Sequence, residues 1–263
     1  MVSALSSQQS FLVVSALLFV ASAALTVVWC GSMSAMRGML MPGGWTMSMV
    51  WMRMPGQTWL SATASFVGMW AAMMVAMMMP SLVLMLQRYR EAIGRAGETY
   101  LDRLTAMVGV GYYAVWTILG VAVFPLGVAL ASTEMRFPLL AHAVPAATGT
   151  IIIIAGALQF TDWKAHHLAD CREGTRCHHA LEPHSGSAFR HGVRLGLHCS
   201  YCCASLTAIL LAVGVMDLRS MILITGAITV ERLAPCGQHV ARAIGVTAVV
   251  AGVLLIARAL RLA

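Results

Sequence analysis

Charged side chains are scarce in this sequence. Only 10% of its 263 residues are Asp, Glu, Lys or Arg, whereas a soluble domain carries about 25%. Hydrophobic residues make up 59% of the chain, and the mean hydropathy is +0.80. This composition excludes an ordinary soluble domain and predicts an integral membrane protein.

Several other features are missing. The N-terminus lacks the basic residues and the cleavage site of a signal peptide, so we expect the first apolar segment to be a retained span. The sequence has no Walker-type phosphate loop and no phosphorylatable Asp motif, which argues against ATP-driven pumping by this chain alone. The net charge of +7 does not indicate nucleic acid, because basic loops orient membrane proteins and suit anionic lipid.

Apolar segments long enough for a bilayer recur along the chain. They predict an all-α, polytopic membrane bundle of six to seven transmembrane helices. The sixth segment is short, and a half-span or a re-entrant piece is the alternative there. The predicted spans are Phe11–Cys30, Ser61–Leu86, Leu104–Ala131, Val144–Thr161, Leu197–Val215, Arg219–Leu233 and Val240–Ala257.

Two parts of the chain differ in composition. Residues 1–59 hold the first span and a Met-rich connection, and we expect residues 60–263 to form one membrane domain with a His/Cys-rich loop at about 164–195; the side chains described below predict that this domain binds metal. Prolines and Gly43-Gly44 argue against one continuous helix in the connection. Its thioethers could pass Cu(I) along weak ligands or simply fill irregular apolar surface. They belong to Met33, Met36, Met39, Met41, Met47, Met49, Met52 and Met54.

The densest group of metal-ligating side chains lies in Gly196-Leu-His-Cys-Ser-Tyr-Cys-Cys203. On a helix, His198 and Cys202 share a face, as do Cys199 and Cys203. Thiolate and imidazole suit Cu(I), Zn(II) or iron and do not suit magnesium or calcium. The seven cysteines are an odd number, mostly clustered with histidines, which favours metal or reduced thiols over disulfides. The alternative is a buried cluster that packs as small apolar side chains.

A methionine row precedes this cluster in sequence. Met73 and Met77 lie in one row at helical spacing, and Met74 and Met78 form the next. Pro80 should kink that helix, and a kink can open a cavity. Core packing is the alternative role for each methionine.

Two further groups of candidate ligands flank the cluster. His167 and Cys171 lie one helical turn apart, before a polar tract with Cys177, His178, His179 and His184. Glu231 lies at the end of the sixth segment, and Cys236 and His239 follow it; we interpret these three residues as a proton or metal relay. An acidic residue at a span end is costly without a partner, and the structural alternative for Glu231 is an ion pair with Arg232 or Arg194.

Counting the crossings gathers these groups on one membrane face. The ends of spans two, four and six and the starts of spans five and seven share a side, provided that the sixth segment crosses. The Met-rich connection lies on the other side. Basic residues are more numerous on the Cys/His side, so the positive-inside rule predicts that this side and the N-terminus are cytoplasmic.

Three stretches resemble a bacterial family, the predicted metal-binding integral membrane proteins. They are Met69-Trp-Ala-Ala-Met-Met-Val-Ala-Met-Met-Met-Pro-Ser81, Lys164 to Cys171, and Gly196 to Cys203, and Glu231 and Pro235 resemble the family's Glu-x-x-x-Pro ending. His167 stands where the family has a Cys, and Ala204 where it usually has Trp. The resemblance covers roughly residues 60 to 257 and implies metal binding without a settled activity.

These observations favour a membrane protein that handles a soft metal in a bacterial inner membrane, with copper favoured and zinc or iron as alternatives. We assign no catalytic residue and favour a binding or transport protein over an enzyme. The expected partners are the lipid bilayer, a metal ion, and a metallochaperone or a second copy of the chain. The predicted metal ligands are His167, Cys171, His198, Cys199, Cys202, Cys203, Met73, Met74, Met77 and Met78.

Two other functions remain open at this point. The first is a membrane metalloenzyme or redox protein acting on a quinone or another lipid-soluble substrate, with Glu231 as a proton shuttle. The second is thiol-disulfide exchange by Cys199 and Cys202, although the thioredoxin-like strand-helix context is missing.

Overall fold

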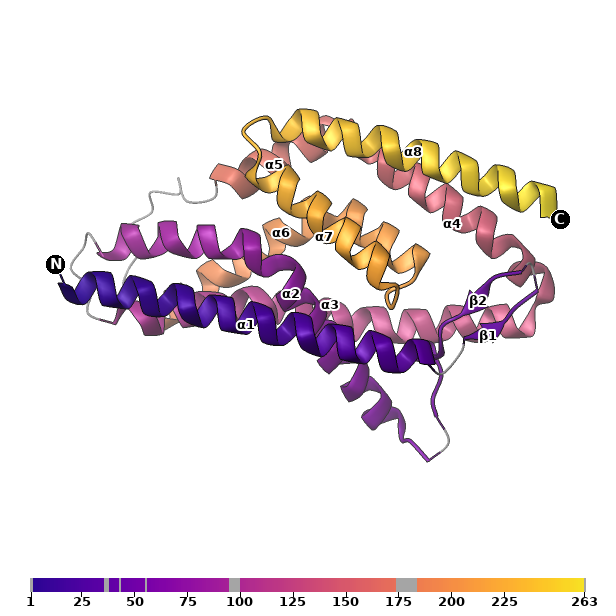
Figure 1. Ribbon diagram of the computed structural model, residues 1–263, viewed down its shortest axis with the longest axis horizontal. Coiled ribbons are helices and arrows are strands. Elements are labelled where there is room, and N and C mark those ends of the chain that lie inside the picture. The colour runs from indigo at the N-terminus through magenta and orange to yellow at the C-terminus, as the bar shows by residue number, and fades with distance from the viewer. Residues whose placement is uncertain are drawn as a thin grey trace.

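The computed structural model describes residues 2–35, 38–42, 44–54, 56–94, 100–173 and 184–262. Within these residues the chain is an all-α bundle, as the sequence predicts (Figure 1). The α-helices of the described residues are α1 Val2–Ala35, α2 Trp59–Gly94, α3 Leu101–Arg136, α4 Pro138–Leu158, α5 Asp162–Glu173, α6 Ser185–Val213, α7 Leu218–Leu233 and α8 Gly237–Leu262.

Six of these helices are long and apolar enough to cross a membrane, namely α1, α2, α3, α4, α6 and α8. The short segment corresponds to α7, a helix of 16 residues that is not among them. Gly214, with φ +134°, ends α6, and Asp217 then caps α7 by accepting a hydrogen bond from Ser220 N at 2.9 Å. The chain therefore reverses direction between α6 and α7 within a few residues.

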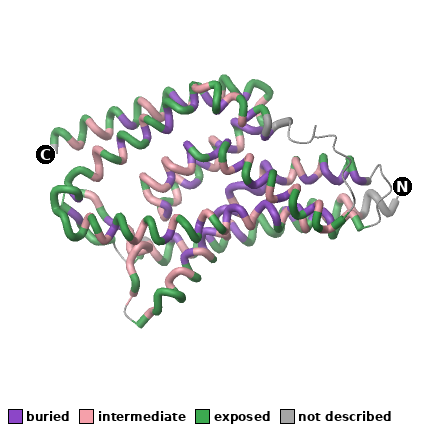
Figure 2. The backbone as a smooth tube through the Cα atoms, turned by 180° about the vertical axis from the view of Figure 1, so that it is seen from behind, coloured by how far each residue is buried: buried purple, intermediate pink, exposed green. Residues whose placement is uncertain are grey.

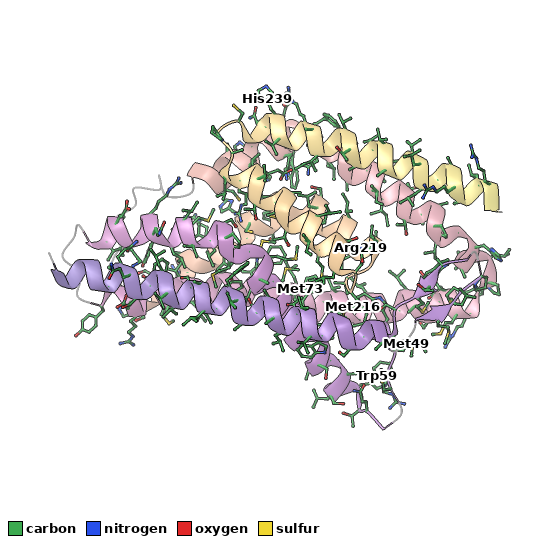
Figure 3. The ribbon with its side chains drawn as sticks, in the orientation of Figure 1. Met49, Trp59, Met73, Met216, Arg219 and His239 are labelled. Carbon is green, nitrogen blue, oxygen red and sulfur yellow. The ribbon has the colours of Figure 1, made fainter. Side chains whose placement is uncertain are left out.

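The two ends of the bundle carry different groups. In Figure 1, α5, the start of α6 and the α7–α8 turn lie at one end, and the Met-rich connection lies towards the other. Figure 3 shows the same separation between His239 and the pair Met49 and Trp59. This arrangement agrees with the grouping expected from counting crossings.

The Met-rich connection forms a small folded cap. Strands β1 (Met39–Leu40) and β2 (Thr46–Met47) pair antiparallel, and the 3-10 helix η1 (Met49–Trp51) follows. Met41 and Met47 are buried against alanines of α3 and α4, whereas Met39 is 40% exposed. For Met41 and Met47 the packing interpretation therefore holds.

Helix α2 passes through the centre of the molecule and changes direction part way along its length (Figure 1). Pro80 lies inside it, where its ring removes a backbone donor and bends a helix. Met73, Met74, Met77 and Met78 are each no more than 2% exposed. Figure 2 shows that buried positions gather in the middle of the bundle, whereas α8 along its edge is mostly exposed.

Glycines bring α6 into backbone contact with α3. A Cβ atom placed on Gly111 would lie 2.3 Å from Phe189 O, and one on Gly192 would lie 2.1 Å from Val108 O. Small residues allow this approach between helices in a membrane. The contact fixes the position of α6, and with it the cysteines that α6 carries.

Two helices extend beyond the predicted spans. The sequence predicts spans that end at Leu86 and begin at Leu104, but α2 continues to Gly94 and α3 begins at Leu101. Arg90 is 3% exposed and pairs with Asp102 at 2.6 Å. Its guanidinium also lies 4.8 Å from the ring centre of Phe11 on α1. Both partners of Arg90 lie on other helices, so the sequence around Arg90 does not indicate that this charge is buried.

The His/Cys-rich tract also contains more helix than the sequence suggested. Helix α5 covers 162–173, and α6 begins at Ser185 and not at Leu197. The buried positions Ala188, Gly192 and Leu195 repeat at helical spacing, but two of them are too small to give an apolar signal. His184 is exposed before α6, and Cys177, His178 and His179 lie outside the described residues.

Candidate metal centre

Four buried cysteines from two helices meet beside α2. Cys171 belongs to α5 and Cys199, Cys202 and Cys203 belong to α6; each is at most 4% exposed. Their thiols lie in a row of neighbours, in which Cys171 is next to Cys202, Cys202 is next to Cys203, and Cys203 lies 3.9 Å from Cys199. The structure thus brings these four predicted ligands together, although Cys171 is distant in sequence from the others.

A thioether extends the row of sulfurs. The Sγ atom of Cys199 lies 3.8 Å from Sδ of Met78 and 3.9 Å from Sγ of Cys203. The Tyr112 hydroxyl donates a hydrogen bond to Cys199 Sγ at 2.8 Å. Met78 is therefore the methionine of α2 with a direct thiol contact, and Met73, Met74 and Met77 are buried elsewhere in the same core.

A buried arginine lies against the thiols. Arg232 of α7 places Nη1 3.3 Å from Cys199 Sγ and 2.8 Å from Ser81 Oγ. Its Nε and Nη2 atoms are buried and have no hydrogen-bond partner among the described residues. The described ion pairs do not include Arg232. A buried cation without a carboxylate is costly, and ionised thiols would supply the missing negative charge.

A second buried charge is neutralised. Lys164 Nζ lies 2.8 Å from Glu231 Oε2 and donates to the backbone oxygen of Cys202 at 2.7 Å. Both side chains are 2% exposed. The alternative ion pair of Glu231 with Arg232 or Arg194 is therefore wrong. Glu231 pairs with Lys164 of α5, because α5 packs against α6 and α7.

The proton on Cys171 is held firmly. The backbone oxygen of His198, at 3.3 Å, and Cys202 are the two acceptors available to the single proton of this thiol. The hydrogen bond to Cys202, followed by burial, raises the pKa of Cys171 well above its ordinary value. A metal ion bound at Cys171 would have to displace this proton, which would couple binding to proton release.

The predicted histidine ligands lie beside the thiols without a hydrogen bond to them in the described part of the chain. The His167 ring stacks on Tyr201 at 5.6 Å and contacts Trp163 at 4.6 Å. His198 is half-buried, and its backbone, not its ring, contacts Cys171. The Nδ1 atoms of both rings are buried without a hydrogen-bond partner among the described residues.

The thiols are neighbours in a row and do not surround a common point. Among the described residues, no group of three or more His, Cys, Asp or Glu side chains has the arrangement of a metal centre. Three sulfurs can converge on one ion only after side-chain rotation.

The relay residues separate into two places. A cavity of about 590 Å³ is lined by parts of α2, α5 and the α7–α8 turn. Cys171 and Arg232 line it, as do the exposed Cys236 and His239 at the turn. Glu231 is not in this lining and faces Lys164. The cavity therefore extends from Cys171, at one end of the row of thiols, to the surface near His239.

Sequence reasoning missed the charged and hydroxyl groups around the sulfurs. Arg232 was considered only as a partner of Glu231, and Tyr112 was given no role. The available signal was the position of Arg232 at the end of an apolar segment, where a charge needs a specific partner.

Comparison with known proteins supports the copper interpretation. No curated protein and no solved structure matches this chain. Residues 67–255 match the sequence profile of a family described as copper chaperone, PpoB2. The matched range contains the four buried cysteines, Met78, Arg232 and the lining of the cavity. Since the match covers more than half of the chain, the protein belongs to the PpoB2 copper chaperone family.

Proposed function

We propose that this membrane protein binds Cu(I) through the thiols of Cys171, Cys199, Cys202 and Cys203, assisted by the Met78 thioether, and passes the ion on. The observation that supports this most directly is the convergence of buried sulfurs from α2, α5 and α6. The family description supplies copper, and the residues supply a soft ligand set that suits Cu(I).

The sulfur spacings suit a metal complex. Sulfur ligands at ~2.3 Å from an ion lie ~3.8 Å apart in a tetrahedron and ~4.0 Å apart in a trigonal arrangement. The Cys199–Met78 and Cys199–Cys203 separations of 3.8 Å and 3.9 Å fall in that range. Small rotations about χ1 would suffice to turn these neighbours towards one ion. A thioether ligand favours Cu(I) over zinc, because zinc sites use thiolate, imidazole and carboxylate.

Charge balance supports a thiolate complex of a monovalent ion. Two thiolates with Cu(I) carry a net charge of minus one, and the buried Arg232 guanidinium beside Cys199 offsets it. Lys164 is already neutralised by Glu231. The charges around the thiols therefore suit a copper complex with one excess negative charge.

Transport is the more specific part of the proposal. Buried methionines of α2 continue from Met78 towards the middle of the bundle, and Cys30 of α1 contacts Met221 of α7 at 3.8 Å between their sulfurs. Weak thioether ligands followed by tight thiolates would let an ion move inwards. The positive-inside rule predicts that the thiol end faces the cytoplasm. Uptake of Cu(I) into vesicles containing the purified protein tests this part, and inert vesicles would limit the function to binding.

Metal content tests the site itself. Protein purified in reductant should bind about one Cu(I) per chain in competition with a colorimetric chelator. The Cys171→Ser and Cys202→Ser variants should each lose tight binding, because each removes one of few thiolates. Cys236→Ser is the matched control for equilibrium affinity, since this cysteine is exposed and outside the row, and its expected relay role concerns the delivery of the ion and not the tight site. Full affinity in a Cys171→Ser/Cys202→Ser double variant would refute the assigned ligands.

A further inference from the structure

The cavity beside the thiols has the size of a small-molecule site. Its volume is about 590 Å³, within the range of ~300–1,000 Å³ that ligand pockets occupy. A bare copper ion needs no such space. The volume therefore indicates a ligand larger than the metal ion.

The lining of the cavity is cationic. Arg88 and Arg232 contribute positive charge to it, and its described lining residues include no carboxylate. Arg232 is 7% exposed, and two of its guanidinium nitrogens lack a hydrogen-bond partner among the described residues. Unpaired guanidinium donors bind carboxylates strongly, so the lining selects an anionic ligand.

The cavity also reaches the metal site. Of the four buried cysteines of the thiol row, Cys171 is the one that lines the cavity among the described residues. Cys236 adds a second thiol at the exposed α7–α8 turn. An occupant of the cavity therefore meets positive charge and a soft ligand together.

We propose that the cavity receives Cu(I) as its complex with an anionic low-molecular-weight thiol and that the copper transfers from this carrier to Cys171. This inference rests on the proposed Cu(I) site, because it identifies the kind of molecule that delivers copper to that site. In the exchange, a bond from copper to Cys171 Sγ forms and the bond to the carrier's sulfur breaks. The proton of Cys171 goes to the departing carrier thiolate, and the copper stays Cu(I), so no oxidant or reductant is needed.

Transfer rates from two donors test this proposal. The full-length protein in detergent is mixed with Cu(I)–glutathione, which is anionic, or with Cu(I) in acetonitrile, whose ligand is neutral. Arg88→Glu reverses a charge in the lining, and Ala169→Trp fills space in it. Each should slow loading from Cu(I)–glutathione about tenfold, because like charge or bulk opposes the carrier, and leave loading from acetonitrile unchanged. Arg190→Glu, an exposed site outside the lining, is the charge-matched control.

A competitor gives an independent readout. S-methylglutathione keeps the carboxylates but has no thiol, so it should slow loading from Cu(I)–glutathione and leave loading from acetonitrile unaffected. Equal slowing of both donors in Arg88→Glu and Ala169→Trp, or no effect of the competitor, would overturn the proposal. Loading by a copper-carrying protein but not by Cu(I)–glutathione would do the same. Failure of the wild type to take Cu(I) from acetonitrile would instead overturn the metal site itself.

Discussion

Replacing Arg232 with Met should weaken Cu(I) binding without unfolding the metal-free protein. Two unit charges 4 Å apart interact by ~4 kcal/mol at an effective dielectric of ~20, and Arg232 Nη1 lies 3.3 Å from Cys199 Sγ. In a complex with one excess negative charge, two sulfurs share that charge, so about half of it lies beside Arg232. The interaction with Arg232 is then ~2 kcal/mol. The expected loss of Cu(I) affinity is therefore about 30-fold.

The same substitution should leave the metal-free protein nearly as stable as before. Ser81 Oγ still donates to Met78 O at 3.0 Å, and Cys199 still accepts from Tyr112, so no buried partner is stranded. Removing a buried cation that lacks a carboxylate is neutral or stabilising when the replacement fills its volume. The change in unfolding free energy should stay within about 1 kcal/mol.

Both quantities can be measured on one preparation. Chelator competition gives the Cu(I) affinity, and thermal unfolding with and without Cu(I) gives the stability. Arg90→Met is the matched control, because Arg90 is equally buried but pairs with Asp102, away from the thiols; it should keep full copper affinity. An Arg232→Met variant that binds Cu(I) as tightly as the wild type would refute the charge-balance argument.

Three other predictions follow from the contacts. Lys164→Met should destabilise the protein by about 3–5 kcal/mol, because Glu231 is left buried without its partner, and Lys164→Met/Glu231→Leu should recover most of that loss; urea unfolding of the single and double variants measures the coupling, and additive effects would contradict it. Gly192→Ala should destabilise the protein markedly, since its Cβ would lie 2.1 Å from Val108 O. Gly109→Ala, with nothing within 4 Å of its Cβ, should be neutral or stabilising by up to ~1 kcal/mol. Equal melting temperatures of the two variants would show that the α3–α6 contact can adjust to the added methyl group. Apparent Cu(I) affinity should rise with pH through the neutral range, because binding removes the proton that the raised pKa of Cys171 retains; calorimetry in buffers of different ionisation enthalpy counts the released protons, and none released would contradict the assignment of Cys171.

The sequence was sufficient for the fold class and for much of the sulfur cluster. Apolar segments of bilayer length mark the helices directly, and the spacing of Cys199 and Cys203 puts both thiols on one helix face. The approach of Cys171 to Cys202 was expected from the way the crossings alternate. These features are local or depend only on counting.

Other features depended on packing between distant helices. Lys164 of α5 pairs with Glu231 of α7, and Arg90 of α2 is covered by Phe11 of α1. Neither partner can be identified from the residues next to Lys164 or Arg90 in the sequence. The beginning of α6 was missed because Gly192 gives no hydrophobic signal, although it is the point of closest approach to α3. The His167 ring packs on the aromatic side chains of Tyr201 and Trp163, contacts that the spacing of His167 and Cys171 does not indicate.

The contact of Lys164 with both Glu231 and the Cys202 carbonyl has a thermodynamic consequence. It ties α5, α6 and α7 to one another before any metal is present, so the helices that carry the sulfurs and the arginine need little ordering when an ion arrives. Such preorganisation reduces the conformational entropy lost on binding. A zinc finger, in contrast, folds only around its ion. Here the scaffold persists when the ion leaves, and the ion can be released and replaced without refolding of the chain.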